Sequence, residues 1–177
     1  TEIYTLSLHD ALPIYFMGGK VYRSLNLMED SSLGAASFYG NIATAANSFG
    51  AAEGIYYKTL EYVKQRTLYG VPMTMLQPIS HRIGKLYAEL EACKALLYDS
   101  CRLIDQGVMR PDLAFSCKGW ICDKSYEIAN ECMIMWGGHA VMDDTDVHRY
   151  MRDLRMGMHA EMTSDMHYAF VAQMILS

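Results

Sequence analysis

The sequence lacks any apolar run of about 18 residues, the length that a membrane-spanning helix requires, so we expect no membrane span. It also lacks an excess of basic residues. Fifteen lysines and arginines stand against 20 aspartates and glutamates, and the net charge is -5. The charges are mixed along the chain and form no basic face, so we expect no nucleic-acid partner.

The sequence also lacks a Cys-x-x-Cys pair and an even number of cysteines. The five cysteines lie mostly within helical patterns: Cys93, Cys101, Cys117, Cys122 and Cys132. This arrangement favours buried thiols over a disulfide framework and indicates a cytoplasmic protein. With 177 residues, 51% of them hydrophobic, the chain is long and apolar enough for one domain with a core.

The first fourteen residues read as the translation of a short-read sequencing adapter. Residues 1–14 carry no helix-capping signal, and we expect them not to belong to the protein, whose reading frame would then be cut at its 5′ side. We therefore exclude His9 and Asp10 from any site. Residues 15–32 contain Gly18-Gly19 and an acidic-serine stretch, which indicate a loop or the last strand of a missing domain.

From about Leu33 onward, apolar residues recur at spacings of three and four, which is the helical period. Proline near the start and glycine at the end of several segments indicate their boundaries. We predict helices over residues 33–70, 77–106, 111–136, 147–154 and 163–175. Neither strand alternation nor an internal repeat occurs after residue 33, so we predict an all-α antiparallel bundle.

Two packing expectations accompany these helices. Gly40, Gly50 and Gly54 lower helix propensity in the first helix, and we interpret them as points of close helix–helix contact. On the last helix the expected apolar side consists of Met166, Phe170, Val171 and Met174.

Four short motifs occur in order along these helices. They are Arg66-Thr67-Leu68-Tyr69-Gly70-Val71-Pro72 followed by Gln77, then Trp136-Gly137-Gly138, Arg152-Asp153 and Glu161-Met162-Thr163. Their order and separation resemble the C-terminal domain of the acyl-CoA dehydrogenase family. That family carries Arg-x-x-Phe-Gly-x-Pro with a downstream Gln, an aromatic-or-His-Gly-Gly turn, an Arg-Asp and a Glu-Gly-Thr. Each motif is weak alone, but the set in order is specific, and the resemblance covers residues 33–177.

The resemblance implies that residues 33–177 form an antiparallel four-helix bundle, the third domain of a larger subunit. Residues 15–32 would be a linker or the tail of a preceding β-domain. The resemblance also implies a homodimer or homotetramer. Because the absent domains would hold most of the FAD and CoA contacts, the fragment alone would be inactive.

The resemblance further implies α,β-desaturation of an acyl-CoA thioester, with FAD as hydride acceptor and an electron-transfer flavoprotein as electron partner. Glu161 corresponds to the catalytic base, and its neighbours in residues 158–162 would desolvate it and raise its pKa. An exposed loop glutamate is the local alternative. Some relatives place the base on the first bundle helix, where this sequence has Gly40 and no carboxylate.

Seven residues correspond to cofactor-binding positions: Arg66, Thr67, Gln77, Trp136, Gly137, Gly138 and Thr163. Arginine makes charge-assisted contacts with phosphate, and glycines let a backbone approach a ligand. Local alternatives remain open for most of them, namely a solvated helix end, a helix C-cap at the glycines and a helix N-cap at the threonine. We interpret Arg152-Asp153 as a structural ion pair or hydrogen-bonding element outside the site.

A metal site is not expected. His159, Glu161, Asp165 and His167 lie close in sequence, but the two histidines are eight residues apart and no Glu-x-x-His pair accompanies them.

Three positions depart from the family pattern. Met162 follows the base where glycine is usual, Ile134 replaces a common glutamine, and His139-Ala140-Val141 replaces a Gly-Tyr-like continuation. They motivate the hypothesis of an unusual acyl group, which is branched, cyclic, aromatic or dicarboxylic. The alternatives to a dehydrogenase are an acyl-CoA oxidase or flavin monooxygenase relative, or a non-catalytic helical oligomerisation module.

Overall fold

The computed structural model describes residues 31–176, with side chains from residue 37 onward. The expectation for residues 1–14 lies outside the described residues. So does that for residues 15–32, except at Ser31 and Ser32, which begin the first described helix. Residues from Asn41 onward form one compact unit, which contains every candidate site residue.

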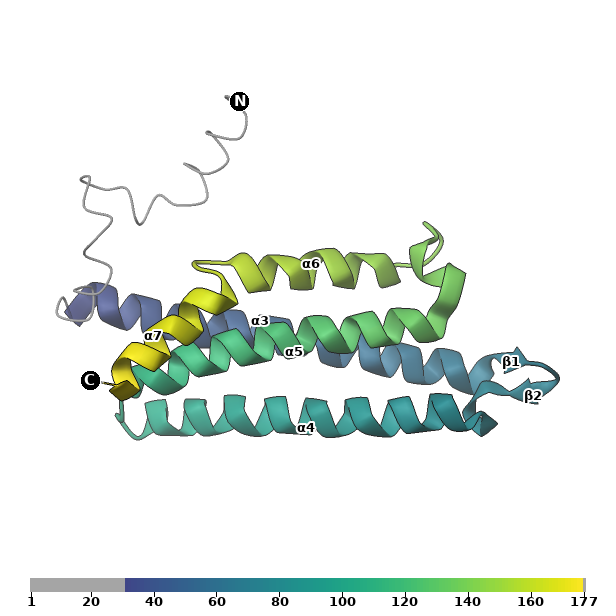
Figure 1. The fold of residues 1–177 in the computed structure, drawn as a ribbon, viewed down its shortest axis with the longest axis horizontal. Coiled ribbons are helices and arrows are strands. Elements are labelled where there is room, and N and C mark those ends of the chain that lie inside the picture. The colour runs from purple at the N-terminus through teal and green to yellow at the C-terminus, as the bar shows by residue number, and fades with distance from the viewer. Residues whose placement is uncertain (1–30, 177) are drawn as a thin grey trace, which may run out of the picture. The chain divides into compact units, whose positions relative to one another are not determined.

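The bundle is all-α, as predicted. Its helices are α3 (Ser31–Gln65), α4 (Gln77–Asp105), α5 (Pro111–Trp136), α6 (Val147–His159) and α7 (Ser164–Leu176). Figure 1 shows α4, α5 and α6 running alongside one another with α3, and α7 packed on α5. The antiparallel four-helix bundle is therefore confirmed.

Long-range contacts fix the direction of each helix. On α3, Lys58 pairs with Asp146 at the start of α6, and the backbone of Gly157 near the end of α6 lies against Ser48. These two contacts make α3 and α6 antiparallel. An ion pair between Arg82 and Glu131 joins the start of α4 to the end of α5, so these helices are antiparallel too.

The helix boundaries follow the predicted signals in most places. Pro78 and Pro111 lie in the first turns of α4 and α5, where a backbone N–H would have no acceptor within the helix, so its absence in proline loses no hydrogen bond. Gly107 and Gly137 follow the ends of these helices with positive φ. Helix α6 extends to His159, five residues beyond the prediction.

The predicted end of the first helix at Gly70 is wrong. Helix α3 ends at Gln65, and a small hairpin follows, formed by β1 (Thr67–Leu68) and β2 (Val71–Pro72). Its turn residues, Tyr69 and Gly70, have φ values of 53° and 80°. Two successive positive φ values are typical of a type I′ hairpin turn, so Gly70 closes a hairpin and not a helix.

Apolar and small residues of α3, α4 and α5 fill the core. Fully buried members include Ala45, Ala52, Ile55, Val63, Cys93, Cys117, Ile121, Cys122, Ile128 and Cys132. All five cysteines are free thiols. Within residues 31–176, no helix has the length and hydropathy needed to cross a membrane.

The expected apolar side of α7 is partly wrong. Met166 is 47% exposed, whereas the polar residues Ser164 and His167 are buried. This polar side faces inward because the imidazole of His167 reaches the side chain of Asn41 on α3. A hydrogen-bonded polar group can be buried at little net cost, so hydrophobicity alone misplaces this face.

Among the glycines of the described residues, Gly157 of α6 makes the closest contact with a neighbouring helix. A Cβ built there would lie 2.4 Å from Ser48 Oγ and 3.6 Å from Cys122 Sγ. Ser48 and Cys122 already share a hydrogen bond of 3.3 Å between α3 and α5. By contrast, Gly50, predicted as a contact point, has no atom within 4 Å of such a Cβ. Gly157 therefore sets the spacing of three helices.

Replacing Gly157 with alanine should destabilise the chain by about 1–3 kcal/mol, because the added methyl group overpacks a full interface. The measurement is the midpoint of urea denaturation. Adding Ser48→Ala should recover much of the loss, because it removes the clashing oxygen. The matched control is Gly84→Ala on α4, where nothing lies within 4 Å and a small gain in stability is expected. Equal midpoints for Gly157→Ala and the parent would contradict this account.

Candidate active site

Glu161 lies in the short loop between α6 and α7. The amide of Met162 donates a hydrogen bond of 2.7 Å to the carbonyl of Ala160, and Glu161 between them has a φ of 61°. A three-residue turn with positive φ is rare and strained, and glutamate seldom adopts it. Strained backbone of this kind concentrates at functional sites, where the surrounding structure holds it.

The carboxyl group of Glu161 is half-buried and incompletely hydrogen-bonded. Its Oε2 atom is buried and has no hydrogen-bond partner among the described residues. Burial raises the pKa of this carboxyl, and the nearby Lys118 lowers it by a smaller amount. An unpartnered buried oxygen with a raised pKa has the properties of a proton acceptor awaiting a ligand.

Two buried side chains hold the C-terminal part of this loop, at Met162 and Thr163. From α5, Lys118 Nζ donates to the carbonyl of Met162 at 2.7 Å. From α7, His167 Nδ1 lies 2.9 Å from the carbonyl of Thr163. Both side chains are fully buried. The loop that carries Glu161 is thus tied to two helices.

His167 is the centre of a buried polar contact between α7 and α3. Burial lowers its pKa to about 4, so the ring is neutral at pH 7. Its Nδ1–H donates to Thr163, which leaves Nε2 as an acceptor, 2.8 Å from Oδ1 of Asn41. Two acceptors cannot bond, and the buried nitrogen of the Asn41 amide has no partner among the described residues, so we assign the amide with its NH₂ group turned toward Nε2.

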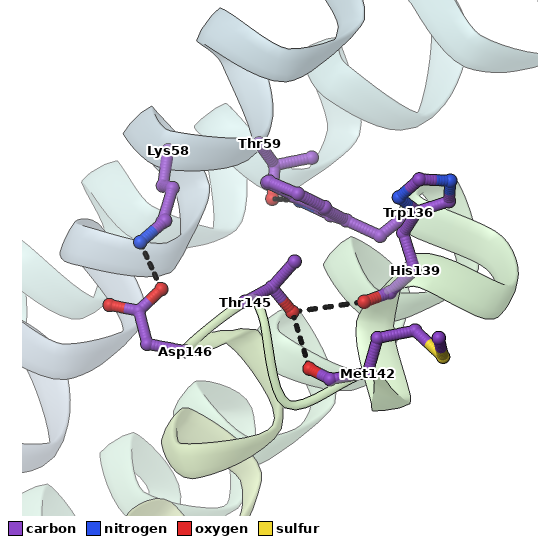
Figure 2. Close-up of polar contacts among 7 residues, drawn as sticks. All are labelled: Lys58, Thr59, Trp136, His139, Met142, Thr145 and Asp146. Atoms are coloured by element: carbon purple, nitrogen blue, oxygen red, sulfur yellow. Dashed lines mark hydrogen bonds and ion pairs between the residues drawn. The ribbon is translucent and has the colours of Figure 1, made fainter.

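Trp136 and the glycines after it lie at the other end of α6. Trp136 Nε1 donates to Thr59 Oγ1 at 2.9 Å, and its ring stacks on Tyr62 with centroids 4.0 Å apart. Figure 2 shows this contact beside the turn that follows, where Lys58 pairs with Asp146. These contacts fix the end of α5 against α3.

The Gly137-Gly138 turn leaves exposed backbone. Gly137 has φ 61° and ψ -140°, a conformation that essentially only glycine adopts. Nothing lies within 4 Å of a Cβ built at either glycine, so their substitution would meet no atom of the chain. The 3₁₀ helix η3 (Gly137–Val141) follows, and Thr145 Oγ1 donates to the carbonyls of His139 and Met142 behind it (Figure 2).

Arg66, Thr67 and Gln77 lie around the hairpin, and their side chains are exposed. Arg66 forms no ion pair with any described residue, and its backbone carbonyl accepts the amide of Met73 at 2.9 Å. Gln77 is the first residue of α4. These donors are therefore available to a ligand from outside the bundle.

The sequence-predicted site residues form two groups within the chain. Helix α6 separates Glu161 and Thr163 from Trp136, Gly137 and Gly138, and its 13 residues span roughly 20 Å. The hairpin lies at the end of the bundle where α5 terminates (Figure 1). The structure thus places Glu161 and Thr163 at one end of α6 and the other six candidates at the opposite end.

Comparison with known proteins identifies the fold and the family. Residues 39–176 match the family described as acyl-CoA dehydrogenase, C-terminal domain. The chain belongs to the acyl-CoA dehydrogenase family. This match contains the base candidate and all seven cofactor candidates.

Individual relatives agree with this membership. The mitochondrial short/branched chain specific acyl-CoA dehydrogenase of Bos taurus is 28% identical over 136 residues, 77% of this chain and 32% of that protein. The caffeyl-CoA reductase-Etf complex subunit CarC of Acetobacterium woodii is 27% identical, covering 77% of this chain and 36% of that protein. The structure of butyryl-CoA dehydrogenase from Megasphaera elsdenii superimposes with a TM-score of 0.76 at 26% identity, covering 78% of this chain and 36% of that one. The chain spans about a third of the length of these relatives.

Two expectations from the family motifs differ from the structure or stay open. Arg152 and Asp153 are exposed on α6, and neither side chain forms an ion pair or a hydrogen bond with a described residue, so the predicted structural role is not found in the described part of the chain. Thr163 precedes the first residue of α7, and its backbone carbonyl accepts hydrogen bonds from the amides of Met166 and His167 at 3.1 and 3.2 Å.

Among residues 31–176, no group of three His, Cys, Asp or Glu side chains could hold a metal ion.

Sequence reasoning missed the two buried groups that hold the loop of this acyl-CoA dehydrogenase domain. Lys118 is the only charged residue on the buried side of α5, between Cys117 and Ile121, and this interruption was the available signal. His167 was considered only as a metal ligand. Its real partner, Asn41, lies 126 residues earlier, and no local pattern reveals such a contact.

Proposed function

We propose that this chain is the C-terminal helical bundle of a longer FAD-dependent acyl-CoA dehydrogenase that desaturates an acyl-CoA thioester. The main support is Glu161, whose buried Oε2 lacks a partner among the described residues at the position where the family motif has its base. A structural role alone would leave no reason for a strained glutamate with an unpartnered oxygen.

The proposed reaction begins with proton abstraction. Glu161 would remove the α-proton of the thioester at its free carboxylate oxygen, and Met158 and Met162 beside it would keep water away. A base works best when its pKa approaches the operating pH, and burial moves the pKa of Glu161 in that direction. Bound FAD would accept the hydride that leaves the β-carbon.

The residues of this chain fit the proposed cofactor. The guanidinium of Arg66 and the amide of Gln77 are exposed donors of the type that binds phosphate and polar groups. The open backbone at Gly137 and Gly138 could approach a planar ring closely. Thr67 and Trp136 would contact the same flavin, whereas Thr163, beside Glu161 at the other end of α6, would contact the flavin of its own site.

We further propose that the flavin reached by Arg66 and Gln77 is held mainly by another subunit of a homodimer or homotetramer. The separation of these residues from Glu161 along α6 supports this arrangement, because one subunit would then contribute to two sites.

We propose an electron-transfer flavoprotein as the redox partner and a cytoplasmic location. The name of the CarC relative refers to a complex with Etf, and the five described free thiols suit a reducing compartment. The same relative is named as a reductase, so reduction of an α,β-double bond is the second candidate. An oxidase or monooxygenase reaction would differ by consuming oxygen.

The test is anaerobic flavin bleaching in the full-length flavoprotein. Straight, branched, cyclic, aryl and dicarboxylic acyl-CoAs are each mixed with the enzyme, and absorbance of the oxidised flavin is followed. We expect at least one saturated thioester to bleach the flavin, and a preference for a non-linear acyl group would support the unusual-substrate hypothesis. The 177-residue chain alone should neither retain FAD nor react. A flavin-loaded enzyme that no saturated thioester bleaches would contradict the dehydrogenase proposal.

A further inference from the structure

Lys118 is a buried lysine that the proposed reaction does not use. Its side chain is 0% exposed, although lysine is almost never fully buried without a partner. Its neighbours on α5, Cys117, Gly119 and Cys122, are buried too. Removing an ammonium group from water is strongly unfavourable, so its partners must explain its position.

Both hydrogen-bond partners of Lys118 belong to the segment around Glu161. Its Nζ donates to the carbonyl of Met162 at 2.7 Å and approaches that of Met158 at 3.5 Å. One carbonyl lies three residues before Glu161 and the other one residue after it. A single ammonium group therefore joins the end of α6 to the exit of the strained turn.

The turn requires such an external support. Glu161 has a φ of 61°, and an unfavourable backbone conformation persists only when surrounding contacts determine it. The carbonyl of Met162 is one of these contacts, because its bond to Lys118 orients the peptide that follows Glu161. Without this bond, the loop can relax to negative φ and turn the carboxyl group away.

We propose that Lys118 is a positioning residue for the base, whose ammonium group holds the strained turn of Glu161 through the carbonyls of Met158 and Met162. This inference rests on the proposed function, in which Glu161 abstracts the proton. The role of Lys118 is indirect, since it binds the loop backbone and not the substrate.

The charges around Glu161 agree with this role. Lys118 lowers the pKa of Glu161, against the larger opposing effect of burial. In turn Glu161, Cys122 and Asp123 favour the charged form of Lys118, which burial disfavours. His167, on α7, has a pKa of about 4 and is neutral at pH 7. Removing Lys118 would therefore leave burial unopposed, and the pKa of Glu161 would rise further.

The test compares three variants in the full-length flavoprotein. Lys118→Met keeps the length and loses the charge, Lys118→Arg keeps the charge with a bulkier head, and Lys124→Met is the matched control. Lys124 lies on the same helix but pairs with Glu127 at the surface. The readouts are the rate of flavin reduction against pH, the KM, the flavin content and amide hydrogen exchange of residues 158–163.

For Lys118→Met we expect a maximal rate lowered roughly 10- to 100-fold, the effect of a misplaced catalytic group, with KM and flavin content close to the parent. Exchange at residues 158–163 should accelerate, and the rise of rate with pH should move to higher pH. Lys118→Arg should keep the parental pH profile, because it retains the charge. Lys124→Met should match the parent in every readout.

Parental rate, pH profile and exchange in Lys118→Met would overturn the proposal and leave Lys118 as a core residue. If that variant does not fold, Lys118→Gln decides, because its side chain carries no charge and is one bond shorter than lysine. Faster exchange at residues 158–163 with a lower rate supports the proposal, and parental values for both overturn it. Failure of the proposed function can be distinguished from failure of this inference. If the parent enzyme desaturates no thioester, amide hydrogen exchange at residues 158–163 can still be compared between the parent and the Lys118 variants.

Discussion

Replacing Glu161 with glutamine in the full-length flavoprotein should lower the rate of flavin reduction by roughly 10²- to 10⁴-fold, the usual contribution of a general base. The amide keeps the size and the turn of the parent residue but cannot accept the α-proton. We expect the flavin spectrum and acyl-CoA binding to stay unchanged. The measurement is single-turnover flavin reduction under anaerobic conditions.

The matched control is Glu91→Gln, an exposed glutamate of α4. It should reduce its flavin at the parental rate. A Glu161→Gln enzyme that equals this control would show that another group abstracts the proton, and the assignment of the base would fail while the fold and family remain.

The second large effect concerns acid stability. The pKa of His167 is lowered to about 4 in the folded chain, from 6.5 in an unfolded one. A lowered histidine pKa means that, as the pH falls, the unfolded state binds the proton before the folded state does. The contribution of the neutral His167 to the free energy of unfolding is therefore fully present above pH 6.5 and is lost as the pH falls toward 4. We expect the free energy of unfolding to fall by about 3 kcal/mol across this window, measured by urea denaturation of the 177-residue chain.

His167→Gln should remove this acid dependence, at the cost of lower stability at pH 7.5 from the altered contacts with Thr163 and Asn41. The exposed His81→Gln variant is the control and should keep the parental dependence. Glu161 acts in the opposite direction. Its pKa is raised in the folded state, so the folded chain binds this proton before the unfolded chain does, and protonation of Glu161 increases the free energy of unfolding as the pH falls. A parent and a His167→Gln variant with the same pH dependence would contradict the buried, neutral histidine.

The sequence predicts the helices well because their end signals are local. Pro78, Pro111, Gly107 and Gly137 each act within one turn, and all four lie at helix boundaries in the structure. The hairpin after α3 was missed because its strands have two residues each, too short for an alternating pattern. The hairpin turn differs from an ordinary helix C-cap in having two successive residues with positive φ, and backbone angles cannot be read from a sequence.

The candidate site was predictable as a set of motifs but not as an arrangement. The family motifs indicate Glu161, yet the strained turn and its anchor on Lys118 depend on how α5 faces the loop. The same limitation applies to Trp136, which was predicted as a cofactor contact. Its indole N–H binds Thr59, 77 residues earlier, and this partner follows from packing alone.

The length of α6 has a consequence for sequence change in this region. Its 13 residues connect the glycine turn to the loop of Glu161, and the contact of Gly157 with Ser48 fixes the rotation of the helix about its axis. Inserting or deleting a single residue would rotate everything beyond it by about 100° and shift it by about 1.5 Å. Exposed positions such as Arg152 and Asp153 can be exchanged freely with respect to the bundle core. Residue count in α6 is therefore constrained more tightly than residue identity, because an insertion or deletion would turn the carboxyl of Glu161 away from its place.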